Sequence, residues 1–422
     1  MKIEKIIQFG EGGFLRGFAD WIVSHLNEAT DFNAGVVVVQ PLERGMCETL
    51  EAQGCVYTHI CRGAEGVEER KIDVITRCVN PYSCYDEYLK LAENKDFRFV
   101  ISNTTEAGIA YCAADTLEGS PFVSFPAKVT ALLKRRFELG LDGFVFLPCE
   151  LIEKNGDKLR EIILRYADDW KLGEAFVRWV KEKNIFCNTL VDRIVPGYPR
   201  GEAIIEQYND NMLNTSEYFH LWVIEGYPEI CREIPFDRID LNVVVTDNLK
   251  KYRDLKVRIL NGAHTATVHY ALLEGMETVK DCMENPKISA FIKKTVFEEI
   301  IPTLEAEREE AEAYANSVLA RFSNPYIRHM LVSITLNSVS KFKVRDLPSL
   351  LAYRERFGKL PENLVFSLAM LIKYYKTREA NDDAEVISFM KTASVSDILG
   401  NVDLWGTDLR FLADEVKKYA DQ

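Results

Sequence analysis

The first forty residues combine two apolar runs with a cluster of glycines between them, and this arrangement constrains the fold more than any other feature. Residues 3–9 (IEKIIQF) predict a strand, and residues 10–13 (GEGG) predict the turn that follows it. The apolar residues between 14 and 26 recur with the period of an amphipathic helix. Residues 36–39 (VVVV) predict a strand buried on both faces, as in a parallel sheet. This segment is therefore expected to form a βαβ unit.

The alternation of strands and helices continues beyond this unit. The next predicted elements are strands at 97–102 and 143–148 and helices at 84–95 and 126–140. Residues 55–62 and 69–79 flank a Gly-Ala-Glu-Gly turn, so they predict an antiparallel hairpin inserted into the sheet. The expected fold class is α/β, with a Rossmann-like doubly wound sheet covered by helices on both faces.

A change of pattern divides the chain into two parts. Its 422 residues exceed the roughly 250–300 at which single cores stop growing. Strand-like runs end near Val243–Asp247, so we expect a Rossmann-like domain at 1–246 and a mainly α-helical C-terminal domain at 247–422. The predicted helices of the second part are 251–274, 286–300, 303–322, 325–340, 361–376, 383–392 and 408–420.

Composition and missing motifs exclude several classes of function. The 52 basic and 65 acidic residues give a net charge of −13, so neither nucleic acids nor anionic membranes are expected as partners. No apolar run reaches the roughly 18 residues that span a bilayer, and no signal peptide is evident. We therefore expect a cytoplasmic chain whose ten cysteines are reduced thiols. Zinc-site spacings, a nucleophile elbow and a P-loop are all missing from the sequence.

The turn Gly10-x-Gly12 after the first predicted strand is a candidate cofactor site. Glycines there let a pyrophosphate approach the backbone, and the following helix offers free N–H groups. The match to Gly-x-Gly-x-x-Gly is incomplete because Leu15 occupies the third glycine position, so a purely structural turn is the alternative. Gln40 stands where an acidic residue would bind the adenosine ribose. Gln40 can hydrogen-bond a ribose but does not repel a 2′-phosphate, so this residue leaves NAD and NADP open.

Lys256, Asn261 and His264 form a second candidate site. On an α-helix, Asn261 lies ~140° and His264 ~80° from Lys256, so the three share one side. An amine, an amide and an imidazole on one side suit alcohol–ketone chemistry, because they can exchange the hydroxyl proton, stabilise an oxyanion and bind a neighbouring hydroxyl. Gly262 inside this helix indicates the close approach of another group. A surface lysine, an incidental asparagine and a core histidine are the alternative.

A third candidate is the cationic run Lys341-Phe342-Lys343-Val344-Arg345. Three cations in five residues are unusual in an acidic chain, and they can bind a substrate carboxylate through charge-assisted hydrogen bonds. An ordinary solvated run of charges is the alternative interpretation.

These motifs together resemble the polyol-specific long-chain dehydrogenase/reductase, or mannitol dehydrogenase, family. The resemblance rests on GEGGFLR at 10–16 and on Lys256-(x)4-Asn261-(x)2-His264. It extends to TTEAG at 104–108, TLVDRI at 189–194 and RF-x-NP at 321–325, and it covers most of the chain in order.

The resemblance implies a metal-independent, NAD-dependent hydride transfer. Lys256 would act as general acid/base, Asn261 would polarise the C–O bond, and His264 and Asp192 would orient the substrate. Lys341, Lys343 and Arg345 are expected to bind a carboxylate. Cofactor contacts are expected from Phe9, Gly10, Glu11, Gly12, Gly13, Phe14, Leu15, Gln40, Asn103, Thr105 and Glu106.

Two segments resemble the members of the family that act on a keto sugar acid. Leu15 replaces a histidine that is usual in mannitol-type members, and PCELI at 148–152 replaces their Cys-Asp-Asn, with Leu151 at the Asn position. The resemblance thus implies the reversible reduction of tagaturonate to altronate, a step of hexuronate catabolism, with no obligate protein partner. Fructuronate or another sugar acid or polyol is an alternative substrate. An NAD(H)-binding redox sensor without turnover and an isomerase with tightly bound NAD are alternative functions.

Overall fold

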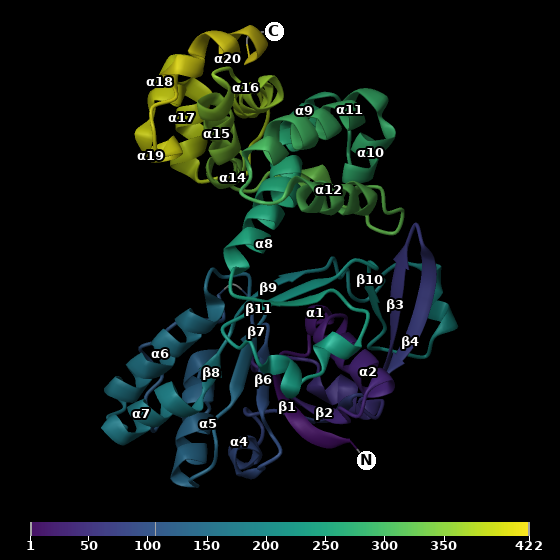
Figure 1. The fold of residues 1–422 in the computed structure, drawn as a ribbon, viewed down its shortest axis with the longest axis vertical. Coiled ribbons are helices and arrows are strands. Elements are labelled where there is room, and N and C mark those ends of the chain that lie inside the picture. The colour runs from purple at the N-terminus through teal and green to yellow at the C-terminus, as the bar shows by residue number, and fades with distance from the viewer. Residues whose placement is uncertain (1, 106, 421–422) are drawn as a thin grey trace. The chain divides into compact units, whose positions relative to one another are not determined.

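The computed structural model describes residues 2–105 and 107–420. The chain forms two compact units, Met1–Leu249 and Lys250–Gln422, which are both drawn in Figure 1. Each unit is built around hydrophobic clusters of its own. Among the helices of the described residues, none has both the length and the apolar character needed to cross a bilayer.

The first unit contains a six-stranded sheet in which neighbouring strands are parallel. The strands lie in the order β5 (Ile75–Val79), β2 (Ala34–Val39), β1 (Ile3–Phe9), β6 (Phe99–Ser102), β7 (Val145–Pro148) and β8 (Ile185–Phe186). Counted along the chain within this sheet, the order is 3-2-1-4-5-6, so the winding reverses between β1 and β6. The predicted Rossmann-like doubly wound sheet is confirmed.

Alternate residues of β2 belong to two different hydrophobic clusters. Val36 and Val38 pack in the cluster that includes α2 (Ala19–Ala29). Val37 and Val39 pack in the cluster that includes α5 (Phe125–Glu138) and α6 (Asn155–Asp169). Figure 1 shows α2 on one side of the sheet and α5 and α6 on the other. A strand with helices on both faces is uniformly apolar for this reason.

The predicted hairpin exists, but its expected insertion into the main sheet is wrong. β3 (Tyr57–Gly63) and β4 (Gly66–Ile72) pair antiparallel and form a separate sheet with β10 (Asn214–Ser216). The expected strand at 69–79 is divided, because only its last part, β5, joins the main sheet. The exposed charged residues of β4 cannot enter a sheet that is covered on both faces.

A third small sheet and a polar network complete the first unit. This sheet consists of β12 (Val243–Thr246), β11 (Leu221–Glu225) and β9 (Asn188–Asp192).

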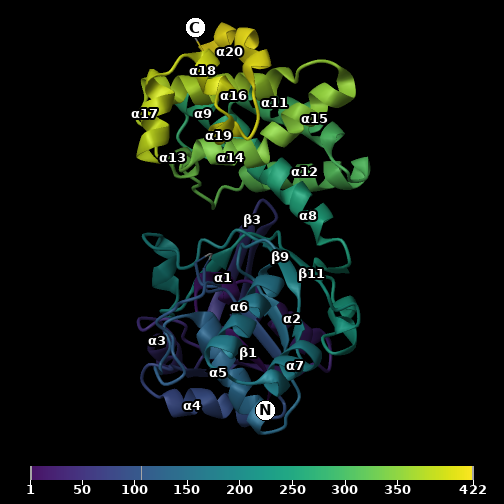
Figure 2. The ribbon, with the colours of Figure 1, turned by 90° about the vertical axis from the view of Figure 1, so that its left-hand side faces the viewer.

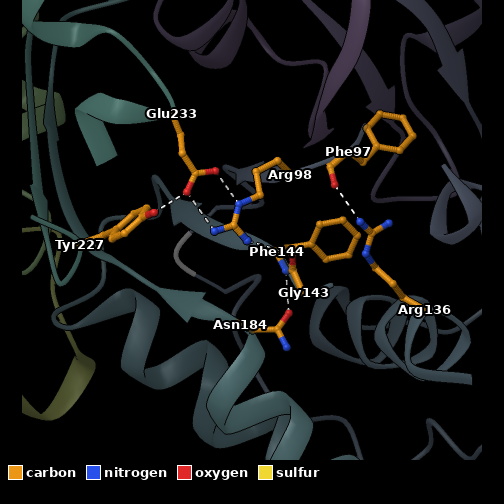
Figure 3. A network of polar contacts seen from close by, with 8 residues as sticks. All are labelled: Phe97, Arg98, Arg136, Gly143, Phe144, Asn184, Tyr227 and Glu233. Carbon is orange, nitrogen blue, oxygen red and sulfur yellow. Dashed lines mark hydrogen bonds and ion pairs between the residues drawn. The ribbon is translucent and has the colours of Figure 1, made fainter. Parts of the chain in front are cut away.

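The polar network lies just before the first residues of β6, β7 and β8 (Figure 3). Arg98 forms an ion pair with Glu233 at 2.6 Å and donates a hydrogen bond to the Gly143 carbonyl. Asn184 accepts a hydrogen bond from the Phe144 N–H at 2.8 Å. These contacts attach the segment around Glu233 to the amino-terminal edge of the main sheet.

The second unit is helical, as expected. Its main helices are α8 (Leu249–Leu255), α9 (Gly262–Leu273), α10 (Val279–Glu284), α11 (Pro286–Lys294), α12 (Arg308–Phe322), α13 (Leu331–Ile334), α14 (Ser338–Arg345), α15 (Leu347–Phe357), α16 (Glu362–Thr377), α17 (Ala384–Thr392), α18 (Val395–Gly400), α19 (Val402–Trp405) and α20 (Ala413–Ala420). Helices α9, α14 and α16 contact one another, as Figures 1 and 2 show. Their buried side chains share one hydrophobic cluster.

Some helix boundaries differ from those predicted. The continuous helix expected at 325–340 is wrong, because Asn337 adopts a left-handed conformation (φ 53°) and separates α13 from α14. Asparagine tolerates this conformation better than most residues do. Helix α12 begins at Arg308 rather than near 303, and α15 was not anticipated. The sequence pattern therefore predicted the class of this unit better than its connections.

Candidate active site

The glycine turn lies at the point where the winding of the main sheet reverses. It follows β1 and leads into a short helix, α1 (Gly13–Arg16). Gly10 has a φ of +122°, and its N–H donates to the Val39 carbonyl at the end of β2. A Cβ at Gly10 would lie 3.0 Å from the Asn103 carbonyl oxygen after β6. Only glycine fits this backbone position, which joins the carboxyl ends of three neighbouring strands.

One side of the turn is closely packed and the other is open. A Cβ at Gly13 would lie 3.1 Å from the Asn214 side-chain oxygen, and a Cβ at Gly17 would lie 2.8 Å from the amide nitrogen of the same residue. At Gly12, by contrast, nothing in the described part of the chain lies within 4 Å of such a Cβ. The open side gives a phosphate group room to approach the backbone. The turn therefore fits the dinucleotide that its sequence suggested.

Buried side chains bind carbonyl groups of the turn and of the short helix α1 that follows it. Each of five carbonyls accepts a hydrogen bond: Gly10 from Gln8 (3.1 Å), Glu11 from Arg16 (3.0 Å), Gly13 from Asn214 (2.9 Å), Arg16 from Tyr57 (2.7 Å) and Gly17 from Arg193 (2.7 Å). All five donor side chains are buried. The sequence did not reveal these contacts, because three of the donors, Tyr57, Arg193 and Asn214, lie 41, 176 and 201 positions from the carbonyls they bind.

Glu11 and Gln40 fix the loop that follows β2. Oε1 of Glu11 accepts a hydrogen bond from the Met46 N–H at 3.1 Å. Burial raises the pKa of the Glu11 carboxyl, while the Met46 N–H opposes the shift. The amide nitrogen of Gln40 donates to the Leu42 and Glu43 carbonyls at 2.9 and 3.1 Å. With both amide hydrogens used in this way, Gln40 offers its carbonyl oxygen, an acceptor, to a ligand.

The loop after β6 is fixed by a buried carboxyl that the sequence interpretation did not single out. Oε1 of Glu150 accepts hydrogen bonds from the N–H and the hydroxyl of Thr104, both at 2.9 Å, and Oε2 accepts one from Ser102. Burial raises the pKa of Glu150, and these donors oppose the shift. Thr105 takes a left-handed conformation with a φ of 71°. Glu106, a predicted cofactor contact, lies outside the described residues.

The side chains of three predicted cofactor residues contribute mainly to packing. Phe9 is fully buried and its ring packs against Phe125 with centroids 4.9 Å apart. Leu15 is buried beside Gly10, whereas Phe14 is half-buried and stacks on Phe18. The exposed Leu151 follows Glu150. These residues place the backbone of the turn, and any contact of Phe9 or Leu15 with a cofactor is expected to come from main-chain atoms.

Asp192 ends β9 next to a deeply anchored arginine. Asp192 is buried and pairs with Leu221 in the third sheet. Arg193 donates to the Glu217 carbonyl twice and to the Gly17 carbonyl, and its guanidinium lies 4.1 Å from the Trp21 ring centroid. Desolvation lowers the pKa of Arg193. The anchored arginine fixes the backbone position from which Asp192 projects.

In the second unit, the three residues of the second candidate site follow one another on a helix that changes its geometry. Residues Lys256–Asn261 form a π-helical turn, which continues into α9 at Gly262. A π-helix bonds residue i to residue i+5 rather than to i+4, so its turns are wider than those of an α-helix, and Asn261 lies close to one turn beyond Lys256. Lys256, Asn261 and His264 are partly exposed, whereas Ile259, Leu260, Gly262 and Ala263 are buried. The helix geometry places these three half-buried residues along one line, the Lys256 stripe.

His264 is packed by the segment that contains the RF-x-NP motif. Its ring stacks on Phe322 at a centroid distance of 4.3 Å and an interplanar angle of 15°. The ring of His329 packs edge-on against the ring of His264, with their centroids 4.9 Å apart. Burial lowers the pKa of His329. Two segments that the family resemblance singled out separately are thus in direct contact, and the contact orients the imidazole of His264.

Gly262 allows the buried carboxyl of Asp346 to approach α9. A Cβ at Gly262 would lie 2.8 Å from Oδ1 of Asp346, a side chain with no exposed surface. Burial raises the pKa of Asp346 well above its ordinary value, although the charges of Arg345 and Arg258 oppose the shift. The close approach that the sequence indicated at Gly262 therefore has an identified neighbour.

The three cations of α14 do not form a single cluster. Arg345 donates to the Thr265 hydroxyl of α9 at 3.0 Å. Lys341 donates to the Ile334 carbonyl, and burial together with the charge of Arg345 lowers its pKa. Lys343 instead donates to the Asp403 carbonyl in α19. The structure thus groups Lys341 with Arg345 and separates Lys343 from them.

Comparison with protein families covers both units. Residues 4–237 match the mannitol dehydrogenase Rossmann domain, and residues 248–420 match the mannitol dehydrogenase C-terminal domain. Altronate oxidoreductases of Escherichia coli O6:K15:H31 (strain 536 / UPEC) and Shigella flexneri are both 50% identical over 400 residues. These alignments cover 90% of the chain and 83% of each relative.

Solved structures share the fold at much lower sequence identity. A D-sorbitol dehydrogenase in substrate-free form matches with a TM-score of 0.85 and 22% identity, over 99% of the chain and 93% of its own. The Pseudomonas fluorescens mannitol 2-dehydrogenase in ternary complex with NAD and D-mannitol matches with a TM-score of 0.73 and 20% identity, over 100% of the chain and 91% of its own.

Proposed function

The chain is an oxidoreductase that belongs to the mannitol dehydrogenase family, and from this premise we propose that it reduces tagaturonate to altronate with NADH, reversibly. The observation that carries the choice of substrate is the 50% identity to altronate oxidoreductases over 90% of the chain. PCELI at 148–152 and Leu15, which distinguish the chain from mannitol-type members, support the same choice.

The Lys256 stripe supplies the acid–base chemistry in this proposal. Bound NADH would deliver the hydride to the ketone carbon. The protonated amine of Lys256 gives its proton to the new alkoxide oxygen, and in the oxidative direction the amine takes the hydroxyl proton back. The Asn261 amide donates to the same oxygen while negative charge develops on it. His264, oriented by Phe322, binds a neighbouring hydroxyl, and Asp192 is a further substrate-orienting residue.

We assign cofactor binding to the first unit, with the pyrophosphate at the turn Gly10–Gly13. The assignment is supported by the close packing of the turn against Asn214 at Gly13 and by the open space at Gly12. Gln40 supports NAD as the cofactor, because its two amide hydrogens are already bonded and its remaining acceptor suits a ribose hydroxyl better than a phosphate. Asn103 and Thr105 lie on the loop next to Gly10 and are expected to contact the same cofactor.

Lys341 and Arg345 are the proposed partners of the substrate carboxylate. They lie one helical turn apart, and the side chain of Arg345 reaches Thr265, the residue after His264. A carboxylate between two partly desolvated cations forms strong, charge-assisted hydrogen bonds. Lys343, which contacts α19, is expected to contribute little.

The test is a panel of NADH oxidation rates with tagaturonate, fructuronate and fructose, repeated with NADPH. We expect kcat/KM for tagaturonate to exceed that for fructuronate by at least about tenfold, and NADH to be preferred over NADPH; a tenfold ratio corresponds to ~1.4 kcal/mol of transition-state discrimination. Altronate should accumulate as the product. Preferred turnover of fructuronate or fructose would assign another substrate, and NADH binding without turnover of any ketone would favour a redox sensor.

A further inference from the structure

The carbonyl of Gly13 in the glycine turn is the end of a chain of buried hydrogen bonds. Asn214 donates from Nδ2 to this carbonyl at 2.9 Å, and the same nitrogen lies 3.3 Å from Nδ1 of His59. Nε2 of His59 lies 2.9 Å from the hydroxyl oxygen of Ser216. Asn214, His59 and Ser216 are all buried. The sequence analysis assigned none of these three residues a role.

The donor and the acceptor of each of these hydrogen bonds can be assigned by starting from Ser216. The Ser216 hydroxyl donates to the Glu217 carbonyl at 3.0 Å, so its oxygen accepts the proton on Nε2 of His59. Nδ1 of His59 is then an acceptor and receives one amide hydrogen of Asn214. The other amide hydrogen goes to the Gly13 carbonyl. This arrangement requires a neutral imidazole, and burial keeps the pKa of His59 well below its ordinary value.

Strand pairing fixes these side chains relative to one another. Asn214 of β10 is the register partner of His59 in β3, in a parallel pair that also aligns Ser216 with Cys61. Asn214 also backs the turn sterically, since a Cβ at Gly13 or Gly17 would come within 3.1 Å of its amide group. The small sheet that the hairpin forms is therefore a support for the turn, rather than an extension of the main sheet.

A fixed carbonyl also fixes the N–H group of the same peptide. In a trans peptide the carbonyl of one residue and the N–H of the next point in opposite directions. The Gly13 carbonyl accepts from Asn214 on the packed side and from the Gly17 N–H, each at 2.9 Å, so the Phe14 N–H points away from both donors. Gln8 and Arg16 fix the carbonyls of Gly10 and Glu11 in the same way. A turn with N–H groups oriented in advance binds an anion without the cost of ordering them.

We propose that Asn214 is a positioning residue for dinucleotide binding, and that it acts by fixing the Gly13–Phe14 peptide through its hydrogen bonds to the Gly13 carbonyl and to neutral His59. The inference rests on the proposed cofactor site. It assigns the orientation of the turn to a residue about 200 positions away in the sequence, and it gives Ser216 and His59 the task of orienting the Asn214 amide.

The test compares Asn214→Ala with Asn184→Ala in the full chain. Asn184 is a matched control, because it is a buried asparagine whose amide bonds the backbone and packs against a glycine, Gly143, at the amino-terminal edge of the main sheet (Figure 3). NADH affinity is measured by fluorescence titration, and stability by urea unfolding. We expect Asn214→Ala to weaken NADH binding about tenfold with kcat at saturating NADH changed less than about threefold. Asn184→Ala should lose comparable stability and keep its NADH affinity within about twofold.

A milder variant keeps the test decisive if Asn214→Ala does not fold. Ser216→Ala removes the acceptor of the His59 proton without touching the turn, and it should weaken NADH binding about threefold. Unchanged NADH affinity in a folded Asn214→Ala or Ser216→Ala variant overturns the inference and leaves the cofactor proposal intact. Equal losses of affinity in the Asn214 and Asn184 variants overturn it as well, because they report general destabilisation. A wild-type chain that does not bind NADH overturns both proposals.

Discussion

The glycine turn of the first unit and the Lys256 stripe of the second are built in opposite ways. Five carbonyls of the turn and of the short helix α1 accept hydrogen bonds from buried side chains, so polar contacts determine the shape of this region. The helix that carries the stripe packs mainly through its own apolar side chains, such as Ile259 and Leu260, and the ring of Phe322 stacks on His264; Arg345 adds one hydrogen bond to Thr265. The first region presents backbone groups, and the second presents side chains.

The difference matches the two tasks assigned to these regions. A pyrophosphate is bound through backbone N–H groups, which point correctly only if the carbonyls behind them are fixed. Proton transfer needs side chains with a common direction, and a helix supplies this through its repeat. The π-helical turn of Lys256–Asn261 brings Asn261 closer to the direction of Lys256, because a π-helix has more residues per turn than an α-helix. We therefore expect substitutions to separate binding from chemistry.

Lys256→Ala is expected to have the largest effect. Without the amine, the stripe loses the group assigned to exchange the alkoxide proton, so kcat should fall by about 10²–10⁴-fold, the usual contribution of general acid–base catalysis. NADH affinity, measured by fluorescence titration, should stay within about twofold, because the turn lies in the other unit. Lys250→Ala, which removes an exposed amine from α8, is the control and should keep full activity. A Lys256→Ala enzyme with more than about a tenth of the wild-type kcat would remove the acid–base role.

Asp20→Asn tests the polar support of the turn through the pH dependence of the free energy of unfolding. Oδ2 of Asp20 lies 3.3 Å from the amide nitrogen of Gln8, which binds the Gly10 carbonyl. Burial raises the pKa of Asp20 from 3.8 to about 7. Between these values the folded chain binds a proton that the unfolded chain has released, so the free energy of unfolding falls as the pH rises through this interval. The fall reaches at most about 4 kcal/mol for this carboxyl.

The asparagine variant mimics the protonated carboxyl and cannot ionise. We expect its stability, measured by urea unfolding at a series of pH values, to lack the component that Asp20 contributes between pH 4 and 7. Above pH 7 the variant should be more stable than the wild type. Asp31→Asn, which changes an exposed carboxyl, should leave the pH profile as it is. Parallel profiles for Asp20→Asn and the wild type would show that Asp20 is ionised throughout.

Much of the fold was predictable because its signals are local. The valines of β2 face two helix layers, and a uniformly apolar strand indicates this directly. The hairpin was placed in the wrong sheet because its partner, β10, lies some 140 positions further along the chain, and no local pattern reveals such a pairing. The break at Asn337 was missed because a left-handed asparagine does not interrupt the apolar periodicity.

The candidate site, like the fold, contains residues that short sequence patterns indicate and residues that they do not. Gly10, Lys256 and His264 were found from short spacings, and family resemblance gave those spacings a meaning. The buried contacts of Asn214 and His59, and the role of Glu150 within PCELI, escaped notice, since a polar residue in the sequence carries no mark of burial or of the group it binds. The π-helical turn was also missed, because the calculation of the helix faces assumed the α repeat.

Gly262→Ala probes how closely the Lys256 stripe depends on packing. Alanine gains about 1 kcal/mol of helix propensity over glycine, but its Cβ would lie 2.8 Å from the buried Oδ1 of Asp346. Overpacking of this kind costs about 1–3 kcal/mol, so a net loss of up to about 2 kcal/mol of unfolding free energy is expected, together with a lower kcat. In an Asp346→Ala background the same change should cost less. Equal costs in the two backgrounds would locate the strain elsewhere.

The smallest effects should come from the cations of α14, where the comparison is between neighbours on one helix. Lys341→Met removes one of the two cations grouped beside α9, so KM for the keto sugar acid should rise about tenfold, the value of one charge-assisted hydrogen bond. Lys343→Met removes a cation that contacts the Asp403 carbonyl, and KM should change less than about threefold. NADH affinity should stay the same in both variants. If Lys343→Met raised KM as much as Lys341→Met, all three cations would act as one diffuse positive patch, and the helix face would carry no specificity.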